Sequence, residues 1–262
     1  MLGAIIGDIV GSVYEKRNYR AKDFQPLFHA NARFTDDTVC TVAVADALLH
    51  GKKPTQALQE WCRRYEDTGG WGQRFALWIA DDDPKPYQSW GNGAAMRISA
   101  VGFLARTEDE AIQWADYFTV VTHDQVDAIA AARAVSLAIY WARQQVDAVD
   151  IADRLTERSG YNLKQTPDDI RPTYKHTESS AGSVPQAMVC ALQSTNYEDA
   201  LRNAVSIGGD SDTIAAIAGS IAEAIHGIPS VIAVKGVMFL PLEMKKIIED
   251  FYEISNSLLD GL

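Results

Sequence analysis

The feature that most constrains the fold is a helical repeat of small and apolar residues that runs through almost the whole chain. It is clearest in the stretch AIAAARAVSLAIYWA, residues 128–142, which is apolar on nearly every side of a helix. A helix without a polar face must be buried among other elements, and small side chains let neighbouring helices pack closely. We find no convincing alternation with a period of two, so no large sheet is expected.

The same periodicity predicts an all-α fold of about a dozen helices. We expect helices over residues 2–14, 37–50, 54–67, 92–105, 108–121, 124–145, 147–159, 184–194, 197–206, 212–226, 229–239 and 242–258. Asp36, Thr107 and Ser183 precede apolar runs and are predicted helix caps, with Pro185 in the first turn after Ser183. Long irregular stretches at about 15–35, 68–91 and 160–182 resemble functional loops rather than linkers, so residues 1–262 should form one domain.

Charge and cysteine content narrow the functional classes. The chain has 24 basic and 35 acidic residues, a net charge of −11, and we identify no basic cluster that offsets it. Nucleic acid is therefore not expected as the main partner, although backbone N–H groups could still bind a phosphate. Cys40, Cys62 and Cys190 fit neither a disulfide framework nor a zinc pattern, and we expect buried, reduced thiols in a cytoplasmic protein.

Membrane segments are also not expected. No run of eighteen apolar residues occurs. The apolar start, residues 1–13, lacks the basic region of a signal peptide and contains Asp8.

Two acidic segments carry the strongest chemical signal. The first is Phe34-Thr35-Asp36-Asp37-Thr38, and the second is Gly208-Gly209-Asp210-Ser211-Asp212-Thr213. Each places two carboxylates and a threonine hydroxyl where a loop becomes a small-residue helix. Oxygen-only ligand sets suit magnesium, manganese or calcium, and two such segments could meet around a pair of ions. Because Asp and Thr also cap helices, the spacing alone leaves capping and metal binding both open.

The beginning of the chain has a glycine stripe. Gly3, Gly7 and Gly11 lie four residues apart, on one face of a helix, where another backbone could approach. Asp8 is a charge within this apolar run and needs partners. Glu15 follows the last apolar turn and is either a solvated helix end or a side chain that reaches into a cleft.

Two further segments are weaker signals when taken alone. Residues 89–97, SWGNGAAMR, contain a Gly-Asn-Gly turn before a helix, which is either an anion site or an ordinary tight turn. Trp90 in this segment could stack on an adenine, but tryptophan is more often a core or rim residue. His123 is at a helix start, where it could donate to a phosphate or a ribose hydroxyl.

Taken together and in this order, the segments resemble the ADP-ribosylglycohydrolase family. The matching residues are GDIVGSVYE (7–15), FTDDT (34–38), SWGNGAAMR (89–97), TH (122–123), AGSVPQA (181–187) and SIGGDSDTIAAIAGSIAEAIHG (206–227). The resemblance implies a single-domain, roughly orthogonal bundle around a central cleft with two Mg²⁺ ions, for which Mn²⁺ is an alternative.

The resemblance also assigns expected roles. The metal ligands would be Thr35, Asp36, Asp37, Asp210, Asp212 and Thr213. The catalytic residues would be Glu15 and Asp210. The substrate-binding residues would be Ser89, Trp90, Gly91, Asn92, Gly93 and His123.

The reaction that the resemblance implies is hydrolysis at the anomeric carbon of the distal ribose. The substrate would be an ADP-ribosylated side chain or small molecule, and the product would be ADP-ribose. Two other classes stay open: a protein that binds ADP-ribose without cleaving it, and a metal-dependent nucleotide phosphohydrolase. The sequence does not distinguish arginine, serine, O-acetyl or nucleobase linkages.

Overall fold

The computed structural model describes residues 1–259 and confirms the all-α prediction. Within that range there are fifteen α-helices, one 3-10 helix and no strand, apart from an isolated bridge between Gly91 and Ser179. The helices are α1 (Leu2–Gly11), α2 (Asp36–His50), α3 (Pro54–Arg64), α4 (Gln73–Ala80), α5 (Gly93–Arg97), α6 (Ser99–Leu104), α7 (Glu108–Thr119), α8 (Val126–Arg143), α9 (Ala148–Ser159), α10 (Pro167–Ile170), α11 (Ser180–Leu192), α12 (Tyr197–Ser206), α13 (Ser211–His226), α14 (Ser230–Val237) and α15 (Leu242–Leu259). The last three residues of the predicted 1–262 domain lie outside the described part.

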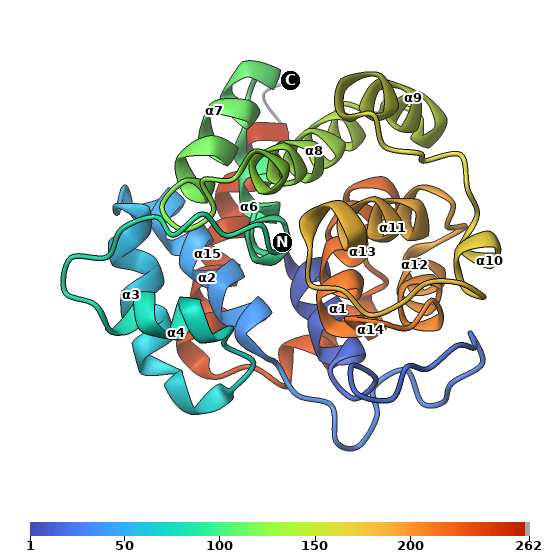
Figure 1. The fold of residues 1–262 in the computed structure, drawn as a ribbon, viewed down its shortest axis with the longest axis horizontal. Coiled ribbons are helices and arrows are strands. Elements are labelled where there is room, and N and C mark those ends of the chain that lie inside the picture. The colour runs from blue at the N-terminus through green and yellow to red at the C-terminus, as the bar shows by residue number, and fades with distance from the viewer. Residues whose placement is uncertain (260–262) are drawn as a thin grey trace.

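The helix pair at the centre of the molecule is α1 and α13, which cross the middle of the bundle (Figure 1). The predicted glycine stripe of Gly3, Gly7 and Gly11 faces α13. A Cβ atom on Gly7 would lie 2.0 Å from the carbonyl oxygen of Ala215, and one on Gly11 would lie 2.4 Å from that of Ser211. The backbone of α13 therefore occupies the space that side chains on α1 would need. This contact places the end of α1 beside the start of α13.

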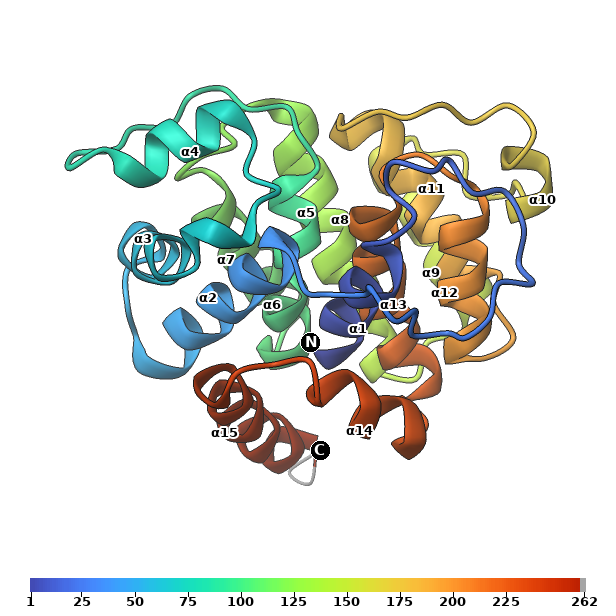
Figure 2. The same cartoon turned by 90° about the horizontal axis from the view of Figure 1, so that it is seen from below.

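Helix α8 is the apolar segment that most constrained the fold. It packs against α5, α6, α7 and α13, and most of its residues are buried. Figure 2, a view from below, shows α1, α8 and α13 enclosed by the other helices, with α14 and α15 along one side. In the described residues, no helix combines the length and apolarity that a bilayer crossing requires. All three cysteines are buried free thiols, with Cys40 Sγ 3.8 Å from Cys62 Sγ.

Several helix boundaries differ from the prediction. The helix expected over 92–105 is two short helices, α5 and α6, that meet at Ile98. Two stretches expected to be irregular contain helices, α4 within 68–91 and α10 within 160–182. Helix α10 has only four residues, too few to show a 3.6-residue period.

Two predicted caps are wrong and one is confirmed. Thr35 caps α2 by accepting from the Asp37 N–H, so Asp36 is the first helical residue. Ser179 caps α11, so Ser183 lies inside the helix and Pro185 follows it there rather than in the first turn. Thr107 caps α7 as predicted, accepting from the Glu110 N–H at 3.1 Å. In both wrong cases an earlier hydroxyl residue satisfies the free N–H groups.

Candidate active site

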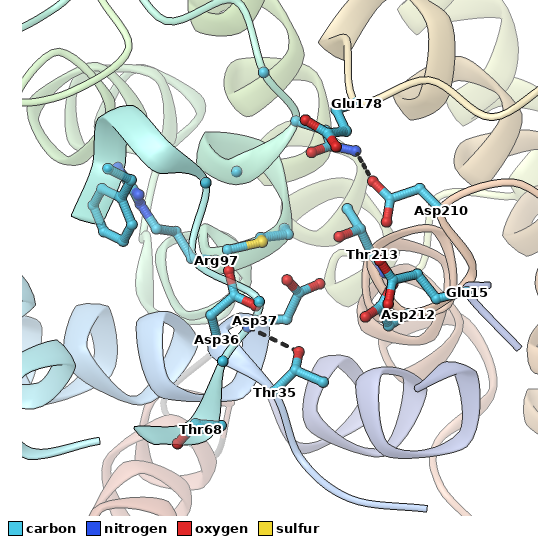
Figure 3. A pocket seen from close by; sticks show the side chains of 18 of the residues that line it. Glu15, Thr35, Asp36, Asp37, Thr68, Arg97, Glu178, Asp210, Asp212 and Thr213 are labelled. Carbon is cyan, nitrogen blue, oxygen red and sulfur yellow. Dashed lines mark hydrogen bonds between the residues drawn. The ribbon is translucent and has the colours of Figure 1, made fainter. Parts of the chain in front are cut away.

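A pocket of about 250 Å³ lies where the starts of α2, α5 and α13 meet the end of α1. Figure 3 shows Asp36 and Asp37 on one side, facing Asp210, Asp212 and Thr213 on the other. Glu15 lies beside the second group, directly after the last turn of α1. The two acidic segments, more than 170 residues apart in sequence, therefore line one cavity.

The first acidic helix start is held by Asp8. Both oxygens of this fully buried carboxylate accept hydrogen bonds from the start of α2. The Thr35 hydroxyl donates to Oδ1 at 2.7 Å, and the N–H groups of Thr35 and Thr38 donate to Oδ2 at 2.9 and 3.1 Å. Because the Thr35 proton points at Asp8, a lone pair of its oxygen stays available to a ligand in the pocket. Asp8 thus has the partners that its position required, and its role as an anchor was missed.

The second acidic helix start is shaped differently. Gly208 and Gly209 both have positive φ values, 73° and 78°, which turn the chain sharply into α13. The side-chain amide of Asn92 donates to Asp210 Oδ2 at 2.8 Å and to the Ser183 hydroxyl at 3.1 Å. This contact ties α5, α11 and α13 together, and it fixes one oxygen of Asp210 while the other faces the pocket (Figure 3).

Crowding of buried acids raises their pKa values. Burial, followed by the charges of Asp8 and Asp210, raises the pKa of Asp36 to about 7. Burial and the neighbouring acids also hold the pKa values of Asp37 and Asp212 well above the ordinary value. Asp37 Oδ2 is buried without any hydrogen-bond donor. Such groups are destabilising unless a cation or a proton neutralises them.

The residues present fit a hard divalent cation. They offer carboxylate and hydroxyl oxygens, and an orphaned carboxylate oxygen faces other acids. Across residues 1–259, however, no three His, Cys, Asp or Glu side chains are gathered closely enough to enclose an ion as they stand. Ion binding would therefore need the facing carboxylates to close toward each other by side-chain rotation. Rotation between staggered rotamers is an ordinary motion of a carboxylate side chain.

The segment of residues 89–97 borders the pocket only in part. Gly91, Asn92 and Gly93 line it, whereas Ser89 and Trp90 do not. Trp90 is 53% exposed, and its predicted contact with the ligand stays a prediction. The Asn92 N–H donates to the carbonyl of residue 178 at 2.8 Å, so this N–H is not available to an anion.

His123 lines the pocket and is held by a relay of hydrogen bonds, and its contact with substrate stays a prediction. The buried Arg97 guanidinium donates to the Thr122 hydroxyl at 2.7 Å, and that hydroxyl is 2.7 Å from His123 Nδ1. Since the Thr122 hydroxyl accepts from Arg97, its own proton is free to donate to Nδ1, and we therefore assign the imidazole proton to Nε2. Burial and the nearby Arg97 charge hold the His123 pKa well below its usual value. A neutral imidazole therefore presents an N–H donor beside Gly91 and Gly93.

Sequence reasoning missed the aromatic side of the pocket. Phe75 from α4 and Tyr87 from the following loop line it, and the Tyr87 and His123 ring centroids are 6.2 Å apart. Gly70 closes over Asp36, because a Cβ atom there would lie 2.0 Å from Asp36 Oδ1. The long irregular stretch that contains these residues was the only available signal.

Comparison with known proteins supplies the identification. A profile of the ADP-ribosylglycohydrolase family matches residues 1–256. The chain belongs to this family. It is therefore an enzyme of the glycohydrolase type that acts on ADP-ribosylated substrates.

The chain is similar to two named relatives and to one solved structure. It is 24% identical to the ADP-ribosylarginine hydrolase Tri1 of Pseudomonas putida, over 87% of this chain and 70% of the relative. It is also 24% identical to the ADP-ribosylhydrolase ARH3 of Danio rerio, over 88% and 82% of the two chains. A solved ADP-ribosylglycohydrolase-related protein complex has a chain with a TM-score of 0.75, 20% identity and 97% coverage of both chains, which supports the fold.

Proposed function

We propose that this glycohydrolase is magnesium-dependent and releases ADP-ribose by cleaving the bond at the anomeric carbon of the distal ribose. The observation that carries the proposal is the pair of acidic helix starts facing each other across one pocket. The scissile group would be an ADP-ribosylated side chain or a small-molecule conjugate. A cytoplasmic location stays a prediction.

Two Mg²⁺ ions, or Mn²⁺ ions in their place, would be held by the oxygen atoms of the two helix starts. The proposed ligands are Thr35, Asp36, Asp37, Asp210, Asp212 and Thr213. When bound, such ions would neutralise the crowded carboxylates, orient the ribose hydroxyls and polarise nearby oxygen atoms. The raised pKa values of Asp36, Asp37 and Asp212 support this role, because these acids lack a counter-charge in the protein itself.

The protein residues would then direct the attack of water on the anomeric carbon. Asp210 or Glu15 would accept the proton of the attacking water. Burial raises the pKa of Asp210, which brings it toward the working pH of a general base, and the Asn92 amide limits that rise. The transition state should have oxocarbenium character, as in other glycosidic cleavages. The neutral His123 would donate a hydrogen bond from its Nε2–H group to a phosphate or ribose oxygen.

The test is to incubate the purified protein with ADP-ribosyl-arginine and ADP-ribosyl-serine peptides and to identify the products by mass. Each reaction would be run without additive, with EDTA, and with EDTA followed by excess magnesium. We expect free ADP-ribose that disappears with EDTA and returns with magnesium. Arginine is the first linkage to test because one relative is named for it.

Other products would replace the proposal. Release of AMP or phosphate would identify a phosphohydrolase, which would use the same oxygen ligands. Binding of ADP-ribose without turnover of any linkage would identify a binding protein. Turnover that is unchanged by complete metal removal would refute the metal dependence.

A further inference from the structure

A second surface feature begins at Glu15 and leads away from the pocket. We call it the basic groove; it lies between the loop of residues 15–20, after α1, and the loop of residues 171–177, before α11. Its first hollow, of about 360 Å³, shares Glu15 with the pocket and is lined by Lys16, Lys175 and His176. A second hollow, of about 480 Å³, shares Lys175 and His176 and continues toward Gln186. In both ribbon views the blue loop after α1 runs beside the region of α10 and α12 (Figures 1 and 2).

The basic groove corrects the expectation that no basic cluster exists. Residues 16–22, KRNYRAK, contain four basic side chains, of which Lys16 and Arg20 line the groove together with Lys175 and His176 from the second loop. The two segments are far apart in a sequence with a net charge of −11, so the sequence does not show that their basic side chains lie together.

The two loops of the groove are fixed to each other and to the active site. The Arg20 guanidinium donates to the backbone carbonyls of Arg171 and Tyr174, which joins the loops directly. The Asn18 side-chain oxygen accepts from Arg20 at 3.2 Å and from the Gly209 N–H at 3.4 Å. The groove is therefore built against the same glycine turn that positions Asp210.

The groove contains carboxylates as well as basic groups, because Glu15 lines the first hollow and Glu178 pairs with His176, so its uncompensated charges are those of the two lysines. Lys16 and Lys175 are exposed, and in the described residues neither forms an ion pair with a carboxylate. His176 Nε2 is 3.9 Å from Glu178 Oε1. Of the nearby acids, Asp169 accepts from Thr166, so its carboxylate is already engaged. An anionic ligand would be the natural partner of the two lysines.

Beside the second hollow, one hydrogen-bond donor and one acceptor have no partner. Tyr174 and Gln186 line this hollow, and the Tyr174 hydroxyl and Gln186 Oε1 are buried without a hydrogen-bond partner. Buried polar atoms normally have partners, so these two residues beside one hollow have a donor and an acceptor to offer to a ligand that reaches them. A peptide backbone, which has both a carbonyl and an N–H, fits this pair.

We propose that the basic groove binds the polypeptide that carries the ADP-ribosyl group, and that it favours modified side chains with acidic neighbours. This inference rests on the proposed function. The proposed function places ADP-ribose beside His123, and Glu15 lines both the pocket and the first hollow, so a leaving group that departs past Glu15 would enter the groove. A polypeptide is favoured over nucleic acid because a net charge of −11 repels a long polyanion, whereas one or two carboxylates need only local cations.

The test compares substrates of whichever linkage the enzyme cleaves. Three peptides would carry the same modified residue flanked by aspartates, serines or lysines, and the free ADP-ribosyl amino acid would be the reference. The variant is Lys175→Glu, with Lys164→Glu as a matched control, since Lys164 is an exposed lysine outside both hollows. We expect the wild type to favour the aspartate peptide over the serine peptide by roughly three- to tenfold in kcat/KM, mainly through KM.

Each outcome decides between the possibilities. Lys175→Glu should abolish or reverse the preference, leave the free conjugate unchanged, and differ from Lys164→Glu, and 0.5 M salt should weaken the wild-type preference. Equal rates on the three peptides, or a preference that survives Lys175→Glu, would overturn the inference while leaving the proposed function intact. Competition by a single-stranded oligonucleotide that Lys175→Glu relieves would identify a nucleic-acid surface instead. No release from the free conjugate or any peptide would be a failure of the proposed function itself.

Discussion

The starts of α2 and α13 have similar sequences but are stabilised in different ways. At α2, Thr35 acts as an ordinary cap, and the buried Asp8 holds the Thr35 and Thr38 groups from behind. At α13, Asp210 precedes the helix without making a side-chain cap, and its carboxylate accepts from Asn92 of another element. The capping interpretation therefore explains part of the first start and fails for the second.

The two helix starts line the same pocket, but residues behind one should matter for stability and residues at the other for activity. Replacing Asp8 removes hydrogen bonds that hold the start of α2, so it should decrease the stability of the fold. At α13, Asp210 makes no side-chain cap, so its removal should affect activity alone, whereas Asp212 Oδ1 accepts from the Thr213 N–H at 3.1 Å. The four predictions below test this separation.

The largest expected effect is loss of turnover in Asp210→Ala and Asp36→Ala. Each removes one proposed ion ligand, and Asp210→Ala also removes a proposed proton acceptor. Ion-mediated charge stabilisation is worth several kcal/mol, so we expect a decrease in kcat/KM of about 10³-fold or more. The measurement is steady-state release of ADP-ribose, with far-UV circular dichroism to verify folding.

Asp109→Ala is the matched control for both variants. Asp109 is an exposed acid in the first turn of α7, at a helix start that does not line the pocket. It should keep full activity. A folded Asp210→Ala protein that turns over near the wild-type rate would remove α13 from the catalytic assignment.

Some residues of the site were predictable from the sequence and others were not. The acidic starts and His123 are local patterns that the structure brings together at one pocket, and the glycine stripe is a local pattern that packs α1 against α13. The partners that hold them were not predictable, because Asp8 to Thr35 and Asn92 to Asp210 are contacts between distant segments. Nothing in a local window distinguishes such a partner from a buried polar residue.

The fold was predictable for a related reason. Long helices with small residues, such as α8 and α13, have a strong period, and their existence and type follow from it. Apart from the wrong caps of α2 and α11, the errors are at short elements, where the five residues of α5 and the four of α10 cannot show a period. The basic groove was missed because its lysines belong to two loops that only the tertiary structure brings together.

The second prediction concerns stability at the α2 start. In Asp8→Asn, an NH₂ group would replace one acceptor oxygen and would face hydroxyl and N–H donors of Thr35 or Thr38. Losing hydrogen bonds to a buried charged acceptor should decrease the free energy of unfolding by about 2–3 kcal/mol. Urea denaturation in EDTA measures this. Asp210→Ala should show no comparable loss, and an equal loss in both proteins would contradict the separation of roles.

The third prediction concerns the support of Asp210. Asn92→Ala removes the amide that fixes Asp210 Oδ2 without removing the carboxylate. Loss of a partner that orients a ligand typically costs 10–100-fold in metal affinity or activity, so we expect an effect of about that size, smaller than that of Asp210→Ala. Magnesium titration of turnover distinguishes weaker ion binding from slower chemistry. An unchanged magnesium dependence together with unchanged kcat would show that Asp210 needs no such support.

The smallest expected effect is a gain in stability when one crowded acid is neutralised in the absence of metal. Folding raises the pKa of Asp8 to about 6 and that of Asp36 to about 7 from an ordinary value of 3.8, and it also raises the pKa of Asp37. The folded state therefore binds more protons than the unfolded state between about pH 4 and 7, so stability in EDTA should fall as the pH rises through this range.

The variant Asp37→Asn tests this in thermal denaturation scans at pH 4 and pH 8. At pH 8 in EDTA its melting temperature should exceed that of the wild type by about 2–4 °C, which corresponds to about 1 kcal/mol for a chain of this size. At pH 4 the gain should vanish, because Asp37 is then protonated in the folded wild type. Magnesium should stabilise the wild type at pH 8 and have a smaller effect on the variant. A wild-type protein that becomes more stable with rising pH in EDTA would show that the facing helix starts do not repel each other, and the need for a cation between them would lose its electrostatic basis.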